Sequence, residues 1–527
     1  MESKFAEVLK EVEEKFGVRL KAHQICATKQ ILVKRKDVFV NLPTGYGKTY
    51  CYTFLPYMYS ALNRPRHDNQ AIVIVISPLV ALMKDQCKRM TEVGVTSAYL
   101  GESQTDEAVK QLIRQGRFQL LFSSPECILS NAWRKLLVSP PYRANLKALV
   151  VDEAHCISQW GNDFRSEYRR VHELRSFILN DVKLMALTAT ATTAIMKDIC
   201  HVLQLKTRCT VAAPPVRENI FYRMCKAKCY ETDLAWLLQL LHEMKTGTPK
   251  TIVYFRNIRA CSLVYEHFMM VLGGNAFVET SSDDSKHCIL AMYYRAVEES
   301  AADQVIHTFS NGDSTLRVVF ATVAFGLGVD IPDVRYVVHW GMPSSLESFY
   351  QESGRAGRDG QPAFSVVYVR PTDYGHMNKS ASAYCKSDEC RRKGLEKYFS
   401  LTRETFCCPS HEKGSSPTHL HNTCKCCHVC YQVCESPVTL DRHTTHEQLE
   451  QLRLNLMQYR DVIMEEGASP LLYNPHITSG IFDYIIDKVV SVATIIFTVD
   501  DVLTYVPSLT EEHASDVLKL VNECIRE

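Results

Sequence analysis

The sequence predicts an α/β protein made of two tandem parallel-sheet lobes, followed by a small helical cysteine-rich module and a helical tail. The lobes are predicted by apolar, β-rich runs that alternate with helical patterns over the first two thirds of the chain. This series breaks at Pro214-Pro215 and then starts again, which indicates two units of similar size. Near Thr372 the composition becomes polar and rich in cysteine. The expected domains are 1–207, 208–372, 373–436 and 437–527.

Each lobe is predicted from its strands, which are short apolar runs between turn residues. In the first lobe we expect strands at Val38–Leu42, Ala71–Ile76, Phe118–Phe122, Ala148–Val151 and Leu184–Leu187. In the second lobe we expect them at Thr251–Phe255, Arg317–Phe320, Tyr336–His339 and Ala363–Val369. Because helical patterns separate these runs, both sheets are expected to be parallel.

The end of the chain is predicted to be helical and acidic. After Pro437 it carries fifteen acidic and six basic residues, in helical patterns such as HEQLEQLRLNLMQYRDVIMEE. An acidic helical module is poorly suited to bind phosphate, so we expect it to pack on the core or to bind a protein partner. The segment HEKGSSPTHLHNT, His411 to Thr423, predicts a loop insertion.

Composition limits the possible classes of protein. The formal net charge of the 527 residues is +1, so contact with a polyanion would depend on local groups of cations, amides and aromatic rings. The longest apolar stretches, Ala71–Met83 and Val489–Val499, are shorter than the roughly 18 residues of a membrane span. The amino terminus has no apolar signal-peptide core, so we expect no membrane and a reducing compartment.

A phosphate-binding loop is predicted at PTGYGKT, which follows an apolar strand and precedes a helical pattern. Its glycines let backbone amides turn toward phosphate oxygens, its lysine neutralises the β- and γ-phosphates, and its threonine hydroxyl ligates Mg²⁺. The residues assigned to ATP are Thr44, Gly45, Gly47, Lys48 and Thr49. Leu42 stands where a leading glycine is usual, so a plain glycine-rich turn is the alternative.

Two adjacent carboxylates follow a later strand, in the segment VVDEAH. Asp152 is expected to hold Mg²⁺, directly or through water, and Glu153 to orient or deprotonate the attacking water. Two neighbouring acids at a buried strand end are costly unless a cation is present. The alternative is a solvated acidic turn, which the upstream Lys48 makes less attractive.

The order of the motifs adds a family resemblance. After the phosphate loop come VISPLVALMKDQ, FSSPE, DEAHCISQWGNDFRSEY, LTATAT, ATVAFGLGVDIPDVRYVVHW and QESGRAGRDG. From about Arg19 to Cys430 the sequence resembles the RecQ family of superfamily 2 DNA helicases, and the DEAHCISQWG wording separates it from DEAD-box RNA helicases. The resemblance implies two RecA-like lobes, ATP and Mg²⁺ as cofactors, and 3′-to-5′ movement on single-stranded and tailed duplex DNA. It also implies DNA repair or recombination in the nucleus.

In QESGRAGRDG, two arginines three residues apart would share one face if the segment is helical. Arg355 and Arg358 are expected to reach from the second lobe toward the γ-phosphate, with Arg358 favoured by the resemblance as the arginine finger. The alternative is a pair that forms surface salt bridges.

Further nucleotide contacts rest on the resemblance. Gln24 matches the glutamine that reads adenine, and Lys21 stands where an arginine is usual. Phe16 is either an aromatic neighbour of the base or a core residue. Gly328 and Asp330 resemble positions that line the nucleotide from the second lobe.

The segment QWGNDFRSEY mixes aromatic rings with a cation, as sites for splayed single-stranded bases do. A core role is the alternative for its rings. The expected base-stacking residues are Trp160, Phe164, Arg165 and Tyr168. By resemblance, the DNA backbone is expected to meet Ser77, Ser124 and Thr322, which would position the strand without reading its sequence. The LTATAT segment, ending at Thr192, is expected to link hydrolysis to lobe movement.

Nine of the 21 cysteines lie between Cys385 and Cys434. By resemblance, a structural four-thiolate zinc site is expected, with Cys390 ahead of a helix and a CxxCxxC group after it. The expected ligands are Cys390, Cys424, Cys427 and Cys430. The insertion brings rival ligands, namely Cys407, Cys408, His411, His419, His421 and Cys426. The alternative is a set of reduced thiols.

The sequence shows neither the winged-helix module that many RecQ helicases carry after the zinc site nor an HRDC domain. In relatives the winged helix supplies a hairpin that splits the duplex, so strand separation is less supported than movement. One alternative is an RNA-directed or duplex-remodelling ATPase that does not separate strands. The other is a nucleic-acid-binding scaffold without turnover, against which the intact Lys48, Glu153 and Arg358 argue.

Overall fold

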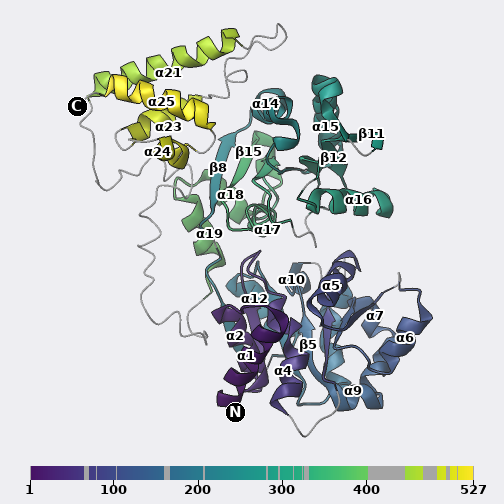
Figure 1. Ribbon diagram of the computed structural model, residues 1–527. Coiled ribbons are helices and arrows are strands. Elements are labelled where there is room, and N and C mark those ends of the chain that lie inside the picture. The colour runs from purple at the N-terminus through teal and green to yellow at the C-terminus, as the bar shows by residue number, and fades with distance from the viewer. Residues whose placement is uncertain are drawn as a thin grey trace.

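Two parallel sheets and a separate group of helices make up the structure, a computed structural model (Figure 1). It describes residues 2–63, 70–78, 80–101, 104–159, 166–205, 208–215, 217–280, 283–294, 297–312, 314–322, 325, 331–401, 445–466, 483–493, 496, 499–506 and 509–525.

The first sheet has seven strands in the order β3-β4-β2-β5-β6-β1-β7, and all its neighbours are parallel. The strands are β1 (Asp37–Asn41), β2 (Ile72–Ile76), β3 (Ser97–Leu100), β4 (Leu120–Ser123), β5 (Leu146–Val151), β6 (Lys183–Thr188) and β7 (Arg208–Ala212). Its helices are α1 (Glu2–Phe16), α2 (Ala22–Leu32), α3 (Tyr50–Thr53), α4 (Leu55–Leu62), α5 (Val80–Val93), α6 (Glu107–Arg114), α7 (Pro125–Leu129), α8 (Asn131–Arg134), α9 (Pro140–Asn145), α10 (Cys156–Gln159), α11 (Ser166–Arg170) and α12 (Thr193–Val202).

The second sheet has six parallel strands in the order β12-β13-β9-β14-β15-β8. They are β8 (Ile220–Lys226), β9 (Thr251–Phe255), β12 (Leu290–Tyr293), β13 (Val318–Ala321), β14 (Tyr336–Trp340) and β15 (Ala363–Val369). Beside them, β10 (Phe277–Thr280) and β11 (Asp283–Cys288) form an antiparallel pair. The helices are α13 (Tyr230–Asp233), α14 (Ala235–Met244), α15 (Ile258–Leu272), α16 (Glu299–Ser310), α17 (Leu346–Ser353), α18 (Lys379–Lys386) and α19 (Arg391–Phe399).

Both sheets are covered by helices on both faces, as alternation along their strands requires. In β1, Val38 and Val40 join one core with α1, α2 and α4, and Phe39 joins the core on the other face. The second sheet likewise has one core with α17 and α19 and another with α14 and α15. Buried positions throughout both strand faces explain why the strands read as continuous apolar runs.

The structure confirms all nine predicted strands, within two residues at each end. It adds β3, β7, β8 and β12, which are the edge strands of the two sheets, and the β10–β11 hairpin. The predicted boundary at 207/208 is wrong by one strand. β7 (208–212) pairs with β1 of the first sheet, so the chain crosses between the lobes only after Ala212.

Helix α19 and the two residues that follow it contact both lobes. Leu395 and Phe399 lie in a core of the second lobe, whereas Leu401 packs against a core of the first. The hydroxyl of Thr193, at the start of α12, donates to the carbonyl oxygen of Ser400 at 3.3 Å. The end of this helix and the residues after it therefore connect the lobes at a place far from the chain crossover in sequence.

The tail forms helices α21 (His446–Glu466), α23 (Asp483–Val492), α24 (Val499–Tyr505) and α25 (Glu511–Cys524), as the sequence predicts. They form a group of their own (Figure 1) and enclose a core. This core includes Leu456, Val489 and Val517. After Val369, the described residues contain helices and no strand. Across the described part of the chain, no helix is both long and apolar enough to span a bilayer.

Candidate functional site

The predicted motifs of the first lobe meet at one edge of its sheet. The phosphate loop follows β1, the DEAH segment follows β5 and LTATAT includes the end of β6. Because the strands are parallel, their carboxyl ends lie at the same edge, where open α/β sheets bind ligands. The site therefore follows from the topology of the sheet.

The phosphate loop turns on its two glycines. Gly45 and Gly47 have φ of +75° and +83°, which side chains with a Cβ rarely adopt. The buried amide of Gln24 donates to the carbonyl oxygens of Tyr46 at 3.2 Å and Gly47 at 2.9 Å. Its Oε1 accepts from the backbone amide of Lys21. The Gln24 side chain therefore holds the phosphate loop through its backbone.

The two predicted Mg²⁺ ligands lie around one buried hydroxyl. Tyr52 donates to Oδ2 of Asp152 at 3.3 Å and also interacts with the side chain of Thr49. Burial raises the pKa of Asp152, the charge of Glu153 adds to this effect, and Lys48 opposes it. A divalent cation would offset this cost, so the donor set fits Mg²⁺.

Glu153 is held by a histidine that reaches the LTATAT segment. His155 Nδ1 lies 3.3 Å from Oε2 of Glu153 and 3.2 Å from Oγ1 of Thr188. Burial favours a raised pKa for Glu153, but the His155 hydrogen bond and the charges of Lys48, His155 and Arg355 outweigh it and lower the pKa. Burial alone would lower the pKa of His155, and Cys156 and Glu153 raise it to about 10. Glu153 also has φ of +45°, a strained conformation for this residue type.

The two predicted arginines of the second lobe face these groups. Arg355 is 5% exposed, and its charge acts on Glu153 of the first lobe. Cγ of Arg358 lies 3.4 Å from where a Cβ on Gly45 would stand. Arg355 and Arg358 lie in the turn after α17. The segment is therefore not helical, and the two arginines do not share the face of a helix. The turn nevertheless brings both side chains to the first lobe.

The lobes are in direct contact at this point. Thr44 of the phosphate loop donates through Oγ1 to the carbonyl oxygen of Gly354 at 3.1 Å. The pKa of Arg355 is lowered mainly by burial, and the charge of Arg358 contributes. A polyanionic ligand at this point would stabilise the charged form of both arginines and offset the cost of burying them.

The expected nucleic-acid contacts have different surroundings. Oγ of Ser77 is buried and has no hydrogen-bond partner among the described residues. Oγ of Ser124 accepts from the amide of Cys127 and caps α7, and Thr322 follows β13 in the second lobe. Tyr168 was wrongly expected to stack on bases: it is 0% exposed and donates to the carbonyl oxygen of Asp152. Trp160, Phe164, Arg165, Gly328 and Asp330 lie outside the described residues.

The structure describes some of the residues expected near the adenine and in the zinc site. Phe16 is a core residue, with its ring 4.9 Å from that of Phe54. Lys21 lies over the Tyr46 ring at 4.5 Å. Cys390 is buried at the start of α19, while Cys424, Cys427, Cys430 and the rival ligands of the insertion lie outside the described residues. The described part of the chain holds no group of three or more side chains that would bind a metal.

Several residues that contact the site are not among the predicted site residues. Tyr52, His155, Arg217 and Asn219 contact the motif residues through hydrogen bonds that depend on the fold. His155 belongs to the VVDEAH segment, and the VREN segment with Arg217 directly follows the predicted break at Pro214-Pro215. Their positions were visible in the sequence, but their partners were not.

Two family models match the chain, one on each lobe. DEAD/DEAH box helicase matches residues 21–199, and helicase conserved C-terminal domain matches residues 233–360. Together the matches include more than half of the chain.

Curated relatives extend over most of the chain. The ATP-dependent DNA helicase RecQ of Haemophilus influenzae is 31% identical over 394 residues, which are 71% of this chain and 58% of that protein. The RecQ-like DNA helicase BLM of Xenopus laevis is 32% identical over 426 residues, which are 75% of this chain and 29% of that protein. This chain thus spans less than two thirds of the length of these relatives.

Solved structures share the fold. The DEAD-box helicase Mss116 bound to ssRNA and UDP-BeF matches with a TM-score of 0.54 at 15% identity, covering 96% of this chain and 92% of that one. The match identifies the two sheets as RecA-like lobes.

Proposed function

Because this chain belongs to the DEAD/DEAH-box helicase family and to its RecQ-like branch, we propose that it is an ATP-dependent DNA motor. Hydrolysis between the lobes would drive it along single-stranded DNA and separate tailed duplexes. The observation that carries the proposal is the approach of Arg355 and Arg358 to the phosphate loop and Glu153 across the lobes. Each lobe alone lacks part of the charge that phosphoryl transfer needs, so hydrolysis is coupled to lobe position.

The proposed roles at the nucleotide follow from these positions. Lys48 and the backbone of Thr44, Gly45 and Gly47 bind the phosphates, and Thr49 and Asp152 hold Mg²⁺, which supplies charge neutralisation when bound. Glu153 orients and deprotonates the attacking water. Arg355 and Arg358 stabilise charge on the transferred group. Gln24 is proposed to meet the adenine, with Gly328 and Asp330 lining the nucleotide from the second lobe.

DNA is proposed as the strand because the relatives at about 30% identity are named DNA helicases. Ser77, Ser124 and Thr322 would contact the sugar-phosphate backbone, so binding is expected to be salt-sensitive and nearly sequence-neutral. Trp160, Phe164 and Arg165 would stack on or contact the bases next to the hydrolytic segment.

The finer features of the proposal rest on the family resemblance of the sequence motifs. They are 3′-to-5′ polarity, a role in DNA repair or recombination, and nuclear localisation. A structural zinc site is proposed with Cys390, Cys424, Cys427 and Cys430 as ligands, of which Cys390 is placed at the start of α19. A protein partner is proposed for the acidic tail.

A second function is favoured by one observation. The described residues after Val369 are helical and contain no hairpin that would split a duplex. An RNA-directed or duplex-remodelling ATPase that does not separate strands therefore stays the alternative. A scaffold without turnover is disfavoured because the acidic and cationic residues that phosphoryl transfer needs are present in both lobes.

The deciding experiment measures ATPase and unwinding together on 3′-tailed DNA, 5′-tailed DNA and RNA of the same sequence. We expect stimulation by DNA and unwinding of the 3′-tailed duplex, with Lys48→Ala as the inactive control. Equal stimulation by RNA would overturn the DNA assignment. Hydrolysis without unwinding would favour the alternative, and near-normal turnover in Lys48→Ala would remove the phosphate-loop assignment.

A further inference from the structure

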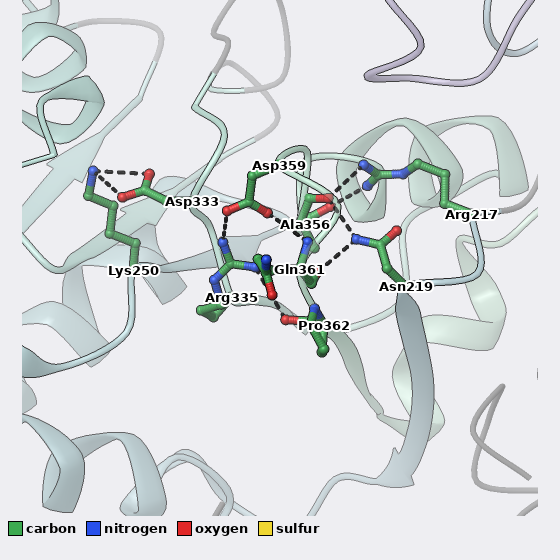
Figure 2. Close-up of polar contacts among 10 residues, drawn as sticks. Arg217, Asn219, Lys250, Asp333, Arg335, Ala356, Asp359, Gln361 and Pro362 are labelled. Carbon is green, nitrogen blue, oxygen red and sulfur yellow. Dashed lines mark hydrogen bonds and ion pairs between the residues drawn. The ribbon is translucent and has the colours of Figure 1, made fainter. Parts of the chain in front are cut away.

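The chain crosses from the first lobe to the second between β7 and β8. This connection is hydrogen-bonded to the loop that carries Arg355 and Arg358. We call residues 213–215 and 217–219, the described part of this connection, the crossover, and residues 354–361 the finger loop. The two segments are more than 130 residues apart in sequence. Figure 2 shows Arg217 and Asn219 of the crossover approaching the finger loop from the same side.

Arg217 binds three carbonyl oxygens of the finger-loop backbone through one guanidinium group. Its Nη1 donates to the carbonyl oxygen of Gly357 and its Nη2 to that of Gly354, each at 3.1 Å. Nη2 also donates to the carbonyl oxygen of Ala356. A planar fork with several fixed donors can hold these acceptors together, whereas a lysine would act as a single point charge.

Asn219 fixes the tightest part of the same loop. Its Nδ2 donates to the carbonyl oxygens of Gly357 and Gln361, both at 2.7 Å. Gly357 has φ of +54°, and a Cβ there would stand 2.6 Å from Nδ2 of Asn219. The loop between the two arginines thus closes around the asparagine amide.

Arg217 also adjoins the first lobe. Its Nη1 lies 3.2 Å from where a Cβ on Gly45 would stand, next to the side chain of Arg358. The carbonyl oxygen of Gly354 accepts both from Arg217 and from Thr44 of the phosphate loop. Crossover, finger loop and phosphate loop therefore meet within one group of contacts.

The crossover is itself held by the second lobe on its other side. Tyr350 of α17 donates to the carbonyl oxygen of Pro215. Arg392 of α19 donates to the carbonyl oxygens of Glu218 at 3.0 Å and Ile220 at 3.1 Å. A change of crossover conformation would therefore be passed to the finger loop.

We propose that Arg217 and Asn219 are positioning residues, which place Arg355 and Arg358 at the γ-phosphate only when the crossover adopts the conformation of closed lobes. This inference rests on the proposed ATP-dependent function. Neither residue needs to touch the nucleotide, because both act through the backbone of the finger loop. The position of the two arginines thereby depends on whether the lobes are closed.

The test compares Arg217→Gln with Arg335→Gln. Arg335 binds Asp359 of the same finger loop and the carbonyl oxygen of Pro362 just after it, and among the described residues none of its hydrogen bonds reaches the crossover (Figure 2). For Arg217→Gln we expect kcat to fall about 10- to 100-fold, the loss typical of a small misplacement of catalytic groups, with KM changed far less. Arg217→Lys should rescue little, and Arg335→Gln should keep kcat within about twofold.

A second readout does not depend on turnover. Beryllium fluoride fills the γ-phosphate position beside ADP, so it should slow release of fluorescent ADP from the unaltered protein. In Arg217→Gln this slowing should be lost while the affinity for ADP alone is kept. Unchanged slowing, or an equal loss of affinity for ADP alone, would overturn the positioning role. An unaltered protein that shows the slowing but no DNA-stimulated hydrolysis would refute the proposed function and leave the positioning role standing.

Discussion

At the scale of single residues, Gly354 marks the place where the lobes touch. Its φ of −66° is open to any residue, so the backbone does not require glycine. The lack of space requires glycine, because a Cβ there would stand 2.0 Å from Oγ1 of Thr44 and 3.0 Å from the carbonyl oxygen of Tyr350. The absence of a side chain therefore lets the finger loop reach the phosphate loop.

We expect Gly354→Ala to lower kcat for ATP by about 10- to 100-fold, because the added methyl group displaces the finger loop from the first lobe. Steady-state ATPase with saturating DNA measures the effect. Gly375→Ala is the matched control, since a Cβ at that position meets nothing within 4 Å. Full activity in Gly354→Ala would mean that the lobes do not use this contact during turnover.

Residues were predictable from the sequence where chemistry demands a residue type at a fixed spacing. Lys48, Asp152 and Arg355 are found this way, and the fold brings all three together. Arg217 was not predictable, because its partners are backbone carbonyl groups, which every segment offers. Tyr168 shows the reverse error, since its aromatic ring suited base stacking but its hydroxyl is used inside the lobe.

At the scale of elements, strands buried on both faces were found from their apolar runs, and edge strands were missed. β1 and β9 lie inside their sheets, whereas β7 and β8 are edge strands with one paired side. An edge strand tolerates polar residues such as Arg208 or Arg223, which weakens the apolar signal. The same effect moved the predicted lobe boundary by one strand.

Helix α19 provides the clearest stability prediction for a single element. Phe399 is 2% exposed, and its ring centroid lies 4.6 Å from that of Tyr350 in a core of the second lobe. Phe399→Ala should lower the free energy of unfolding by about 3–5 kcal/mol through lost burial and a cavity. Urea denaturation measures this change. Met270→Ala, at a side chain that is 80% exposed, should change it by no more than about 0.5 kcal/mol.

At the scale of the whole molecule, the proposed zinc site would join α19 to the chain that follows it. We expect about one zinc per chain by mass spectrometry of metals, as a closed four-thiolate site requires. Cys427→Ser should lower the zinc content, whereas Cys229→Ser, at an exposed cysteine of the second lobe, should leave it unchanged. A fully folded preparation without zinc would refute the site.

The tail makes its own contribution to the whole molecule through charge. Its fifteen acidic and six basic residues lie in a chain whose formal net charge is +1, so the rest of the chain is strongly basic. The near-neutral total thus hides two regions of opposite charge. The tail core shares no residue with the cores of the lobes, so its removal should leave the lobes folded.

Deletion of residues 437–527 should therefore strengthen binding to single-stranded DNA, because it removes acidic charge that repels phosphate. At about 50 mM salt we expect the affinity to rise several-fold, and the gain should shrink at about 300 mM salt, where screening is stronger. Fluorescence anisotropy with a labelled oligonucleotide measures both values. A full-length variant with Glu447, Glu450 and Asp461 changed to the corresponding amides should show part of the gain with the tail still present. A gain that does not depend on salt would contradict electrostatic repulsion and indicate that the tail covers the DNA site directly.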